Sequence, residues 1–153
     1  MKKALFAIPV LALVAFIASG FLFAPSDQEQ ITKALNDSAA AAGRGEPSDV
    51  FKYLSRNFTY GGEQTNTFDI SKVINQAKPK IAIMETKAEI AGETATVRTP
   101  VDIQLDYVGL EINQTIPGVT ITLKKETAFK WLIVPEPRWR ITAVDAESLP
   151  TDY

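Results

Sequence analysis

"FKYLSRNFTYGG", residues 51–62, changes its pattern midway, and this change decides how the chain on either side is interpreted. Its first half is typical of the end of a short helix, with Phe51 and Leu54 on one apolar side. Its second half, Phe58-Thr59-Tyr60, is rich in strand-forming residues, and Gly61-Gly62 ends the strand. The stretch therefore predicts a helix that runs into a strand, followed by a turn.

A longer helix is predicted before this junction and another after it. Ser26 and Glu29 have the spacing of a capping box, and Gly43 or Gly45 ends the first helix. The run of alanines in this helix predicts close packing against a broad surface such as a sheet. The third helix begins at Thr67 as its cap and ends before Pro79. The apolar side of the first helix carries Ile31, Leu35, Ser38, Ala39 and Ala42, and that of the third carries Phe68, Ile70, Val73, Ile74 and Ala77.

From Lys80 onward the apolar residues recur with a period of two, which predicts strands with one buried and one wet face. Ala91-Gly92-Glu93 predicts a turn, and Pro100 predicts a bulge or a strand edge in the strand that follows. Inward residues of that strand are Ala95, Val97, Val101, Ile103, Leu105 and Tyr107, and its wet face carries Thr94, Thr96, Arg98, Asp102, Gln104 and Asp106.

Two more inward rows follow, separated by turn signals. Ile116-Pro117-Gly118 predicts a loop and Pro135-Glu136-Pro137 predicts a turn. "RWRITAVDAE", residues 138–147, is predicted to be the last strand, with Trp139, Ile141 and Ala143 inward. Three helices followed by an antiparallel meander predict an α+β domain. The row before this last strand carries Val119, Ile121, Leu123, Phe129, Trp131 and Ile133.

The composition excludes several kinds of site. The chain has 153 residues, enough for one domain, and contains neither Cys nor His. Disulfides, thiol nucleophiles, Ser–His pairs and ordinary zinc sites are therefore excluded. After the first 24 residues the chain has 14 basic and 18 acidic residues, a net charge of −4. This acidic balance argues against a nucleic-acid partner.

The N-terminus is predicted to lie outside the folded domain. Lys2 and Lys3 precede residues 4–24, a run of 21 residues without charge, which is long enough as a helix to cross a bilayer. The Lys pair favours an N-terminus on the cytoplasmic side. We expect residues 1–24 to be a retained membrane anchor, with Ala4 to Ala24 as the helix that crosses the bilayer. A signal peptide cleaved near Ala18-Ser19-Gly20 is the alternative. Either outcome places residues 25–153 outside the cytoplasm.

The order of these elements, the helix–strand junction "VFKYLSRNFTY" (residues 50–60) and the closing "PRWRITAVDAE" (residues 137–147) resemble the nuclear transport factor 2-like superfamily. The resemblance covers about residues 26–148 and rests on apolar positions and turn residues. It implies three helices packed on a strongly bent antiparallel sheet, a cone-shaped roll; another α+β roll, such as a cystatin-like one, is the alternative. The superfamily includes isomerases, cyclases and dehydratases as well as binding modules, so the fold alone does not choose a function.

Two residues are candidates for chemistry in such a cone. Tyr60 is expected at its mouth, where the hydroxyl would orient a ligand, although we favour the interpretation as an aromatic rim residue packed on Phe68. Asp145 shares the parity of Trp139 and Ile141, so a regular strand would point its carboxylate inward, where it would serve as a general base. The interpretation that we favour for Asp145 is a solvated acid at the end of the strand, and the inward base is the alternative.

Two further aromatic residues are candidates for ligand binding. Trp131 and Trp139 lie on adjacent predicted strands and would either line a pocket or fill the core. Asp102 and Asp106 share the polar face, but two carboxylates offer too few oxygens for Ca²⁺. We therefore expect no metal and no cofactor.

The expected function follows from these exclusions. We favour an exported, membrane-anchored, non-enzymatic domain that binds a small apolar ligand or an envelope protein, with Tyr60, Trp131 and Trp139 at the ligand. The wet face of the sheet would serve a homodimer. The alternative is a cofactor-free isomerase or cyclase with Asp145 as base and Tyr60 as hydrogen-bond donor.

Overall fold

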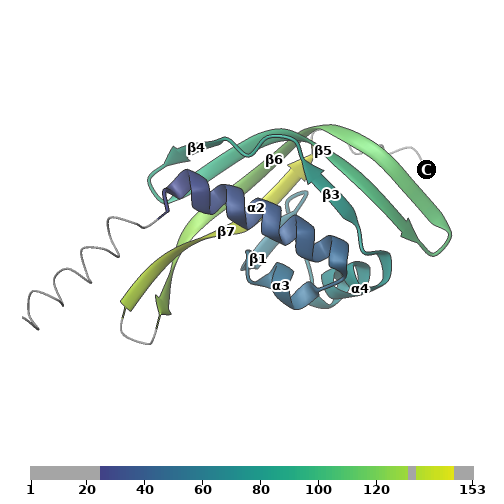
Figure 1. Cartoon of the computed structure of the whole chain (residues 1–153), viewed down its shortest axis with the longest axis horizontal. Helices are drawn as coiled ribbons and strands as arrows, with labels where there is room; N and C mark the ends of the chain where they lie inside the picture. Colours follow the sequence, from purple (N-terminus) through teal and green to yellow (C-terminus); the bar gives the residue numbers. More distant parts are fainter. Residues whose placement is uncertain (1–24, 131–133, 147–153) are drawn as a thin grey trace, which may run out of the picture.

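The computed structural model describes the backbone of residues 25–130 and 134–146 and the side chains of residues 25–127 and 138–146. In this part of the chain, three helices pack on one side of a single curved sheet that arches over the longest helix (Figure 1). The helices are α2 (Asp27–Arg44), α3 (Pro47–Phe51) and α4 (Thr67–Ala77). The strands are β1 (Leu54–Tyr60), β2 (Glu63–Gln64), β3 (Lys80–Ile83), β4 (Ala88–Ala91), β5 (Thr94–Tyr107), β6 (Leu110–Lys130) and β7 (Val134–Ala146).

Helix α2 begins and ends where its sequence predicts. The Ser26 hydroxyl accepts a hydrogen bond from the Glu29 backbone N–H, and the Ser26 N–H donates to the Glu29 carboxylate, both at 3.2 Å. This reciprocal pair is the predicted capping box. At the other end Gly45 adopts a left-handed conformation with φ of 74°, which a residue without a Cβ atom tolerates best. The predicted boundaries of this helix are confirmed.

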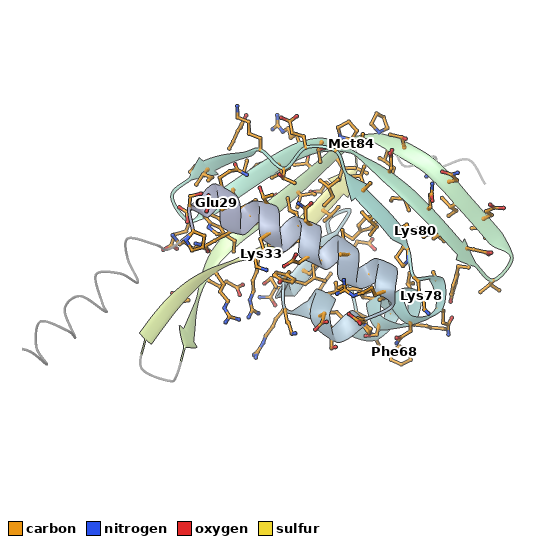
Figure 2. The ribbon with its side chains drawn as sticks, viewed as in Figure 1. Glu29, Lys33, Phe68, Lys78, Lys80 and Met84 are labelled. Atoms are coloured by element: carbon orange, nitrogen blue, oxygen red, sulfur yellow. The ribbon has the colours of Figure 1, made fainter. Side chains whose placement is uncertain are left out.

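Helix α4 differs from the prediction at its first turn. Asn66, rather than Thr67, caps it, and its side-chain oxygen accepts the Phe68 N–H at 2.9 Å. The predicted inward position of Phe68 is wrong: the side chain is 70% exposed and points away from the body (Figure 2). Ile74 is the buried residue of this helix and Ile70 is half-buried, so only the middle and the end of α4 face the interior.

The sheet is mixed, which corrects the expectation of a purely antiparallel one. Its strand order is β2-β1-β7-β6-β5-β3, and β4 pairs with β5. Strand β1 runs parallel to β7, whereas the other described pairings are antiparallel. Tight turns force neighbouring strands to be antiparallel, but β1 and β7 are separated by most of the chain. No connection therefore dictates their relative direction.

Pro100 marks a bulge, as predicted. Thr99 pairs with Val119 and Val101 with Ile116, so the pairing slips at Pro100 opposite residues 117–118 of β6. The predicted loop at Ile116-Pro117-Gly118 is therefore an irregularity inside β6. Residues 135–137, predicted to be a turn, likewise lie within β7 and pair with β6. Bulges allow prolines and glycines inside long strands, and they also bend the sheet.

A second bulge lies in β7 at Thr142. Ile141 pairs with Leu123 and Ala143 with Thr122, so Thr142 is an extra residue in β7. Its hydroxyl donates to the Thr122 carbonyl oxygen at 3.1 Å, which fixes the bulge in place. Because one residue is added, the alternation reverses, and the residues that face inward after the bulge have even numbers.

The predicted alternation of β5 is confirmed in its first half. Ala95 and Val97 are fully buried, Val101 is 5% exposed, and Arg98 faces solvent. Toward Tyr107 the inward residues are only half-buried, because the β5–β6 hairpin extends beyond the helices (Figure 1). No helix within residues 25–130 and 134–146 is long and apolar enough to cross a membrane. The predicted anchor at residues 4–24 lies outside the described residues.

Candidate ligand cavity

A cavity of about 540 Å³ lies between the helices and the concave face of the sheet. This volume is in the range of small-molecule sites. All three helices and five of the strands contribute to its wall. The α-helical and neighbouring wall residues are Leu35, Ser38, Ala39, Ala42, Val50, Asp69, Ile70, Val73, Ile74 and Pro79, and the remainder are Leu54, Phe58, Tyr60, Thr65, Ile81, Ile83, Val101, Ile103, Ile116, Val119, Ile121, Ile141, Val144 and Ala146.

The cavity exists because one half of α2 carries small side chains toward the sheet. Ser38, Ala39 and Ala42 line the wall at this end of the helix. The sequence predicted that the alanines pack closely on a sheet, and for Ala39 and Ala42 this is wrong in part, since both border open space. Because the sheet is curved and the helix is straight, the two separate along part of α2, and short side chains do not fill the gap between them.

The wall is apolar, with few groups able to bind a polar atom. Among its described residues, those with polar side chains are Ser38, Tyr60, Thr65 and Asp69. Ser38 is 8% exposed, and its hydroxyl already donates to the Leu35 carbonyl oxygen at 3.0 Å. Deep in the cavity a ligand therefore meets hydrocarbon, and its polar atoms are best placed elsewhere.

The other three polar residues lie together at the mouth. Tyr60 is 42% exposed at the end of β1, Asp69 is exposed in the first turn of α4, and Thr65 lies in the segment between them. Val73, one turn after Asp69, is also exposed. Since these are the wall residues most accessible to solvent, the cavity opens between the end of β1 and α4.

Of the predicted ligand-binding residues that the structure describes, one lines the cavity and one does not. Tyr60 lines the cavity at its mouth. Trp139 is 3% exposed in the core beneath the start of α2 and is not among the lining residues. Trp131 lies outside the described residues. Phe68 points into solvent, so the alternative in which Tyr60 packs against it is not supported.

The interpretation of Asp145 as a solvated acid at the end of the strand is confirmed, and the alternative of an inward carboxylate is wrong. The bulge at Thr142 reverses the parity of β7, so Val144 and Ala146 line the cavity and Asp145 is exposed. The register gives the same result, because Asp145 pairs with Thr120 whereas the buried Ile121 pairs with Val144. A carboxylate in this position cannot act as a general base on a ligand inside the cavity.

Trp139 instead joins the start of α2 to the sheet. Its indole N–H donates to the Asp27 carboxylate at 3.0 Å, and the Lys125 ammonium reaches the same oxygen at 3.1 Å. The indole N–H and then the ammonium hold the pKa of Asp27 below its ordinary value, because both stabilise the ionised form. Lys125 also lies 5.9 Å from the centre of the Trp139 ring. This cluster closes the end of the domain opposite the cavity.

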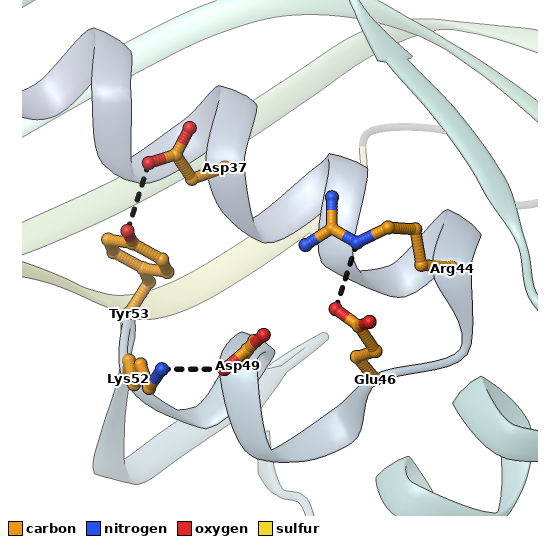
Figure 3. A network of polar contacts seen from close by, with 6 residues as sticks. All are labelled: Asp37, Arg44, Glu46, Asp49, Lys52 and Tyr53. Carbon is orange, nitrogen blue, oxygen red and sulfur yellow. Dashed lines mark hydrogen bonds and ion pairs between the residues drawn. The ribbon is translucent and has the colours of Figure 1, made fainter.

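A second, polar hollow of about 310 Å³ lies between α2, α3 and the start of β1, and Figure 3 shows the residues around it. The Tyr53 hydroxyl donates to Asp37 at 3.0 Å, Lys52 contacts Asp49 at 2.6 Å, and Arg44 pairs with Glu46. Burial, together with this bond to Asp37, raises the pKa of Tyr53. The charges around this hollow are paired with one another, so it joins the elements and offers a ligand little.

Comparison with known proteins identifies the fold. A nuclear transport factor 2-like protein from Cytophaga hutchinsonii superposes with a TM-score of 0.64 at 11% identity, over 82% of this chain and all of that one (100%). Another from Novosphingobium aromaticivorans, with a cystatin-like fold, gives 0.60 at 14% identity over 94% and 90% of the two chains. The chain has a nuclear transport factor 2-like fold. No protein-family model matches the sequence, and no curated protein matches it.

One structure with an enzyme's description also shares this fold. A ketosteroid isomerase-like protein from Shewanella frigidimarina superposes with a TM-score of 0.51 at 19% identity, over 76% of this chain and 93% of that one. At these identities the likeness concerns the fold alone, and function has to be argued from the cavity.

Sequence reasoning missed Asp69 and Thr65. Asp69 follows an N-cap, where an acidic residue is explained by the helix dipole, and Thr65 lies in a short connection, so neither carries a catalytic or binding motif. Their place at the mouth results from the packing of α4 beside the end of β1. One sequence signal pointed to this region, the Tyr60-Gly61-Gly62 break, which is indeed at the rim of the cone.

Proposed function

We propose that this domain binds a small, predominantly apolar molecule in its cavity and does not catalyse a reaction on it. The observation that supports the proposal is a preformed cavity of about 540 Å³ whose wall is almost entirely hydrocarbon. Apolar contact supplies roughly 25 cal/mol per Å² of surface removed from water, so such a wall favours binding without any charged group.

The alternative, an isomerase or cyclase, lacks its base. Asp145 faces solvent, and Asp69 is the carboxylate among the described lining residues. Asp69 is exposed and lies in the first turn of α4. A general base of this kind usually needs a raised pKa and a dry setting. The positions of both carboxylates favour the binding role.

The proposal extends to location. Residues 4–24 carry no charge and follow a Lys pair, which favours a domain held at the outer side of the membrane. Fractionation of expressing cells with intact-mass measurement tests this part. A full-length form in the cytoplasm would contradict the proposed location. A form that begins near Phe21 would show that residues 1–20 are a cleaved signal peptide and not an anchor. A homodimer through the wet face of the sheet stays a prediction.

A matched pair of variants tests the binding role. Ala39 lines the cavity, whereas the exposed Ala40 borders the polar hollow on a neighbouring face of the same helix. We expect Ala39→Phe to fill the cavity and abolish the binding of 1-decanol, and Ala40→Phe to leave it unchanged. Calorimetric titration of residues 25–153, which lack the predicted anchor, measures the effect. Equal binding by the two variants, or none by the unmodified chain, would contradict the proposal.

A further inference from the structure

The β5–β6 hairpin has a free edge beyond the end of β7. Strand β6 pairs with β5 from Leu110 onward, but its pairing with β7 begins only at Val119, opposite Ala146. In the described part of the chain, no strand therefore lies against the outer edge of residues 110–118 (Figure 1). Strand β3 likewise reaches only to Gln104 of β5, so the end of the hairpin is a ribbon of two strands. Such a ribbon is marginally stable on its own in water.

The turn at the tip of this ribbon determines which backbone groups point to the free edge. A two-residue turn with positive φ at both positions, Val108 (52°) and Gly109 (78°), joins β5 to β6. Residues that flank such a turn bond to each other, and bonded pairs recur at every second residue. The even-numbered residues from 110 to 116 thus bond to β5. The odd-numbered residues point their N–H and C=O groups to the free edge; these are Glu111, Asn113 and Thr115.

This edge lacks the residues that usually keep strand edges apart. Lysine and proline commonly protect an exposed edge, and residues 110–116 contain neither. The turn limits the edge on one side, and Pro117 with the bulge beside it limits the edge on the other. The free backbone groups therefore form a short row that is symmetric about Asn113.

A second copy of the same edge matches this row. If two β6 strands pair antiparallel about a two-fold axis at Asn113, Glu111 lies opposite Thr115 of the second copy. All three free residues then exchange hydrogen bonds with the second copy, two bonds per pair. With the axis one residue earlier or later, one of the three would face the turn or Pro117, which has no N–H.

The side chains agree with this register. Because odd-numbered residues lie opposite odd-numbered ones, the apolar faces of both ribbons lie on the same side of the joined sheet. Leu110, which is 50% exposed, comes opposite Ile116 of the second copy. Glu111 faces a threonine and not an acid. The two Glu111 carboxylates are four residues apart along the strands, about 14 Å, a distance at which salt screens their repulsion.

We propose that two copies of this chain associate edge to edge through residues 110–116 of β6, with a two-fold axis at Asn113, so that their two sheets become one. This interface is independent of the cavity. It also differs from a homodimer through the wet face, in which the two sheets would lie face to face. The edge is short, so the dimer is expected to be weak and to depend on concentration.

Single cysteines test the register, because the chain has no cysteine of its own. Asn113→Cys places two thiols opposite each other in the proposed dimer, and a disulfide needs Cα atoms within about 7 Å of each other. Thr115→Cys is the matched control, since it is exposed on the same strand and the same face, but its two copies would be about 14 Å apart. We expect oxidation with copper phenanthroline to convert most of the full-length Asn113→Cys chain in expressing cells to a covalent dimer, and little of the control.

A second pair of variants tests the backbone bonds. Asn113→Pro removes an N–H that points to the free edge and none that bonds to β5, whereas Asn113→Thr keeps this N–H. Light scattering on residues 25–153 should show a concentration-dependent dimer for Asn113→Thr and a monomer for Asn113→Pro. Urea denaturation establishes whether the proline variant is folded; if it is not, the cysteine pair alone decides.

Several outcomes contradict the proposal. Equal cross-linking of the two cysteine variants, or none in either, overturns it, and so does a dimer that survives in folded Asn113→Pro. Hydrogen exchange then assigns the edge. In a monomer, protected amides at Glu111 and Thr115 would show that another segment of the same chain covers the edge, and unprotected amides would leave it to a foreign strand. None of these results bears on the binding of 1-decanol, so the proposed function is tested separately.

Discussion

The two halves of α2 pack on the same sheet with opposite results. Residues 27–34, the closed half, pack without space: Ile31 is fully buried, and Asp27 is tied to Trp139 and Lys125. Residues 35–44, the open half, place Ser38, Ala39 and Ala42 toward a cavity. Helix propensity differs little between the halves, so side-chain size and sheet curvature account for the contrast.

This contrast assigns different tasks to the two ends of the domain. The closed half is also tied to the segment before β4, since the Gln28 amide donates to the Thr86 carbonyl oxygen at 2.8 Å and accepts the Ala88 N–H at 2.9 Å. The open half also has such a contact, from the Tyr53 hydroxyl to Asp37, but it borders the cavity as well. We therefore expect the closed half to determine stability and the open half to determine binding, and the following predictions test that division.

The largest expected effect is on stability in the closed half. Ile31→Ala should lower the free energy of unfolding by about 2–5 kcal/mol, because a fully buried side chain leaves a cavity in a packed core. Ile70→Ala is the matched change, since Ile70 is also helical but is half-buried and borders the existing space. Its cost should be about 1 kcal/mol. Urea denaturation measures both, and equal losses would remove the distinction between the halves.

The Asp27 cluster should give the next effect. Asp27→Ala leaves the indole N–H of buried Trp139 without its acceptor, which should cost about 1–3 kcal/mol. Asp27→Asn keeps an oxygen in the same place and loses only the charge. We expect the asparagine variant to retain most of the stability in thermal and urea unfolding. If the two variants were equally destabilised, the acceptor would not matter and the charge would.

A cavity-filling change should have opposite effects on stability and binding. Ala39→Leu adds apolar surface inside the open half, which should raise the free energy of unfolding by about 1 kcal/mol and weaken the binding of 1-decanol. Ala40→Leu, on the exposed side, is the control for helix propensity. A gain in stability without any loss of affinity would place the ligand elsewhere.

The smallest effect is a dependence of stability on pH. The pKa of Asp27 is lowered in the folded chain by the Trp139 N–H and then by Lys125. A lowered pKa means that this contribution is present above the ordinary value for Asp, about 3.9, and is lost as pH falls through the folded value. Because the carboxylate is 38% exposed, the contribution is below about 1 kcal/mol.

Asp27→Asn provides the measurement of this contribution. The difference in urea midpoint between the unmodified chain and this variant should be larger at pH 7 than at pH 3. A difference that stays constant between these two values would show that the ionised form of Asp27 gains nothing from its neighbours.

Most of the fold was accessible from the sequence, because its signals are local. The Ser26–Glu29 capping box, Gly45 and the alternation in β5 each depend on residues close in the chain. The parallel pairing of β1 with β7 was not accessible, since it joins segments more than 80 residues apart. The helices and the main strands thus followed from patterns along the chain, whereas the number of strands, their order in the sheet and the direction of β1 did not.

The candidate site was predicted less well, for a specific reason. Tyr60 was found because a glycine pair marks the rim. The inward alternative for Asp145 was wrong because a period-two pattern carries no sign of an extra residue: Thr142 is an ordinary strand former, and only its pairing opposite Thr122 shows the bulge. Asp69 was overlooked because an acid in the first turn of a helix is common. One bulge therefore decides which residues of β7 face the cavity.

The bulge in β7 also bears on the register in which β7 pairs with β6. If β7 docked on β6 without its extra residue, Ala143 and Asp145 would take the places of Val144 and Ala146 on the cavity wall. A one-residue slip of this kind turns every side chain to the opposite face. The misdocked form would hold an unpaired carboxylate against hydrocarbon. The free-energy cost of burying this charge makes the misdocked form unfavourable. An acid at position 145 therefore disfavours the register that lacks the bulge.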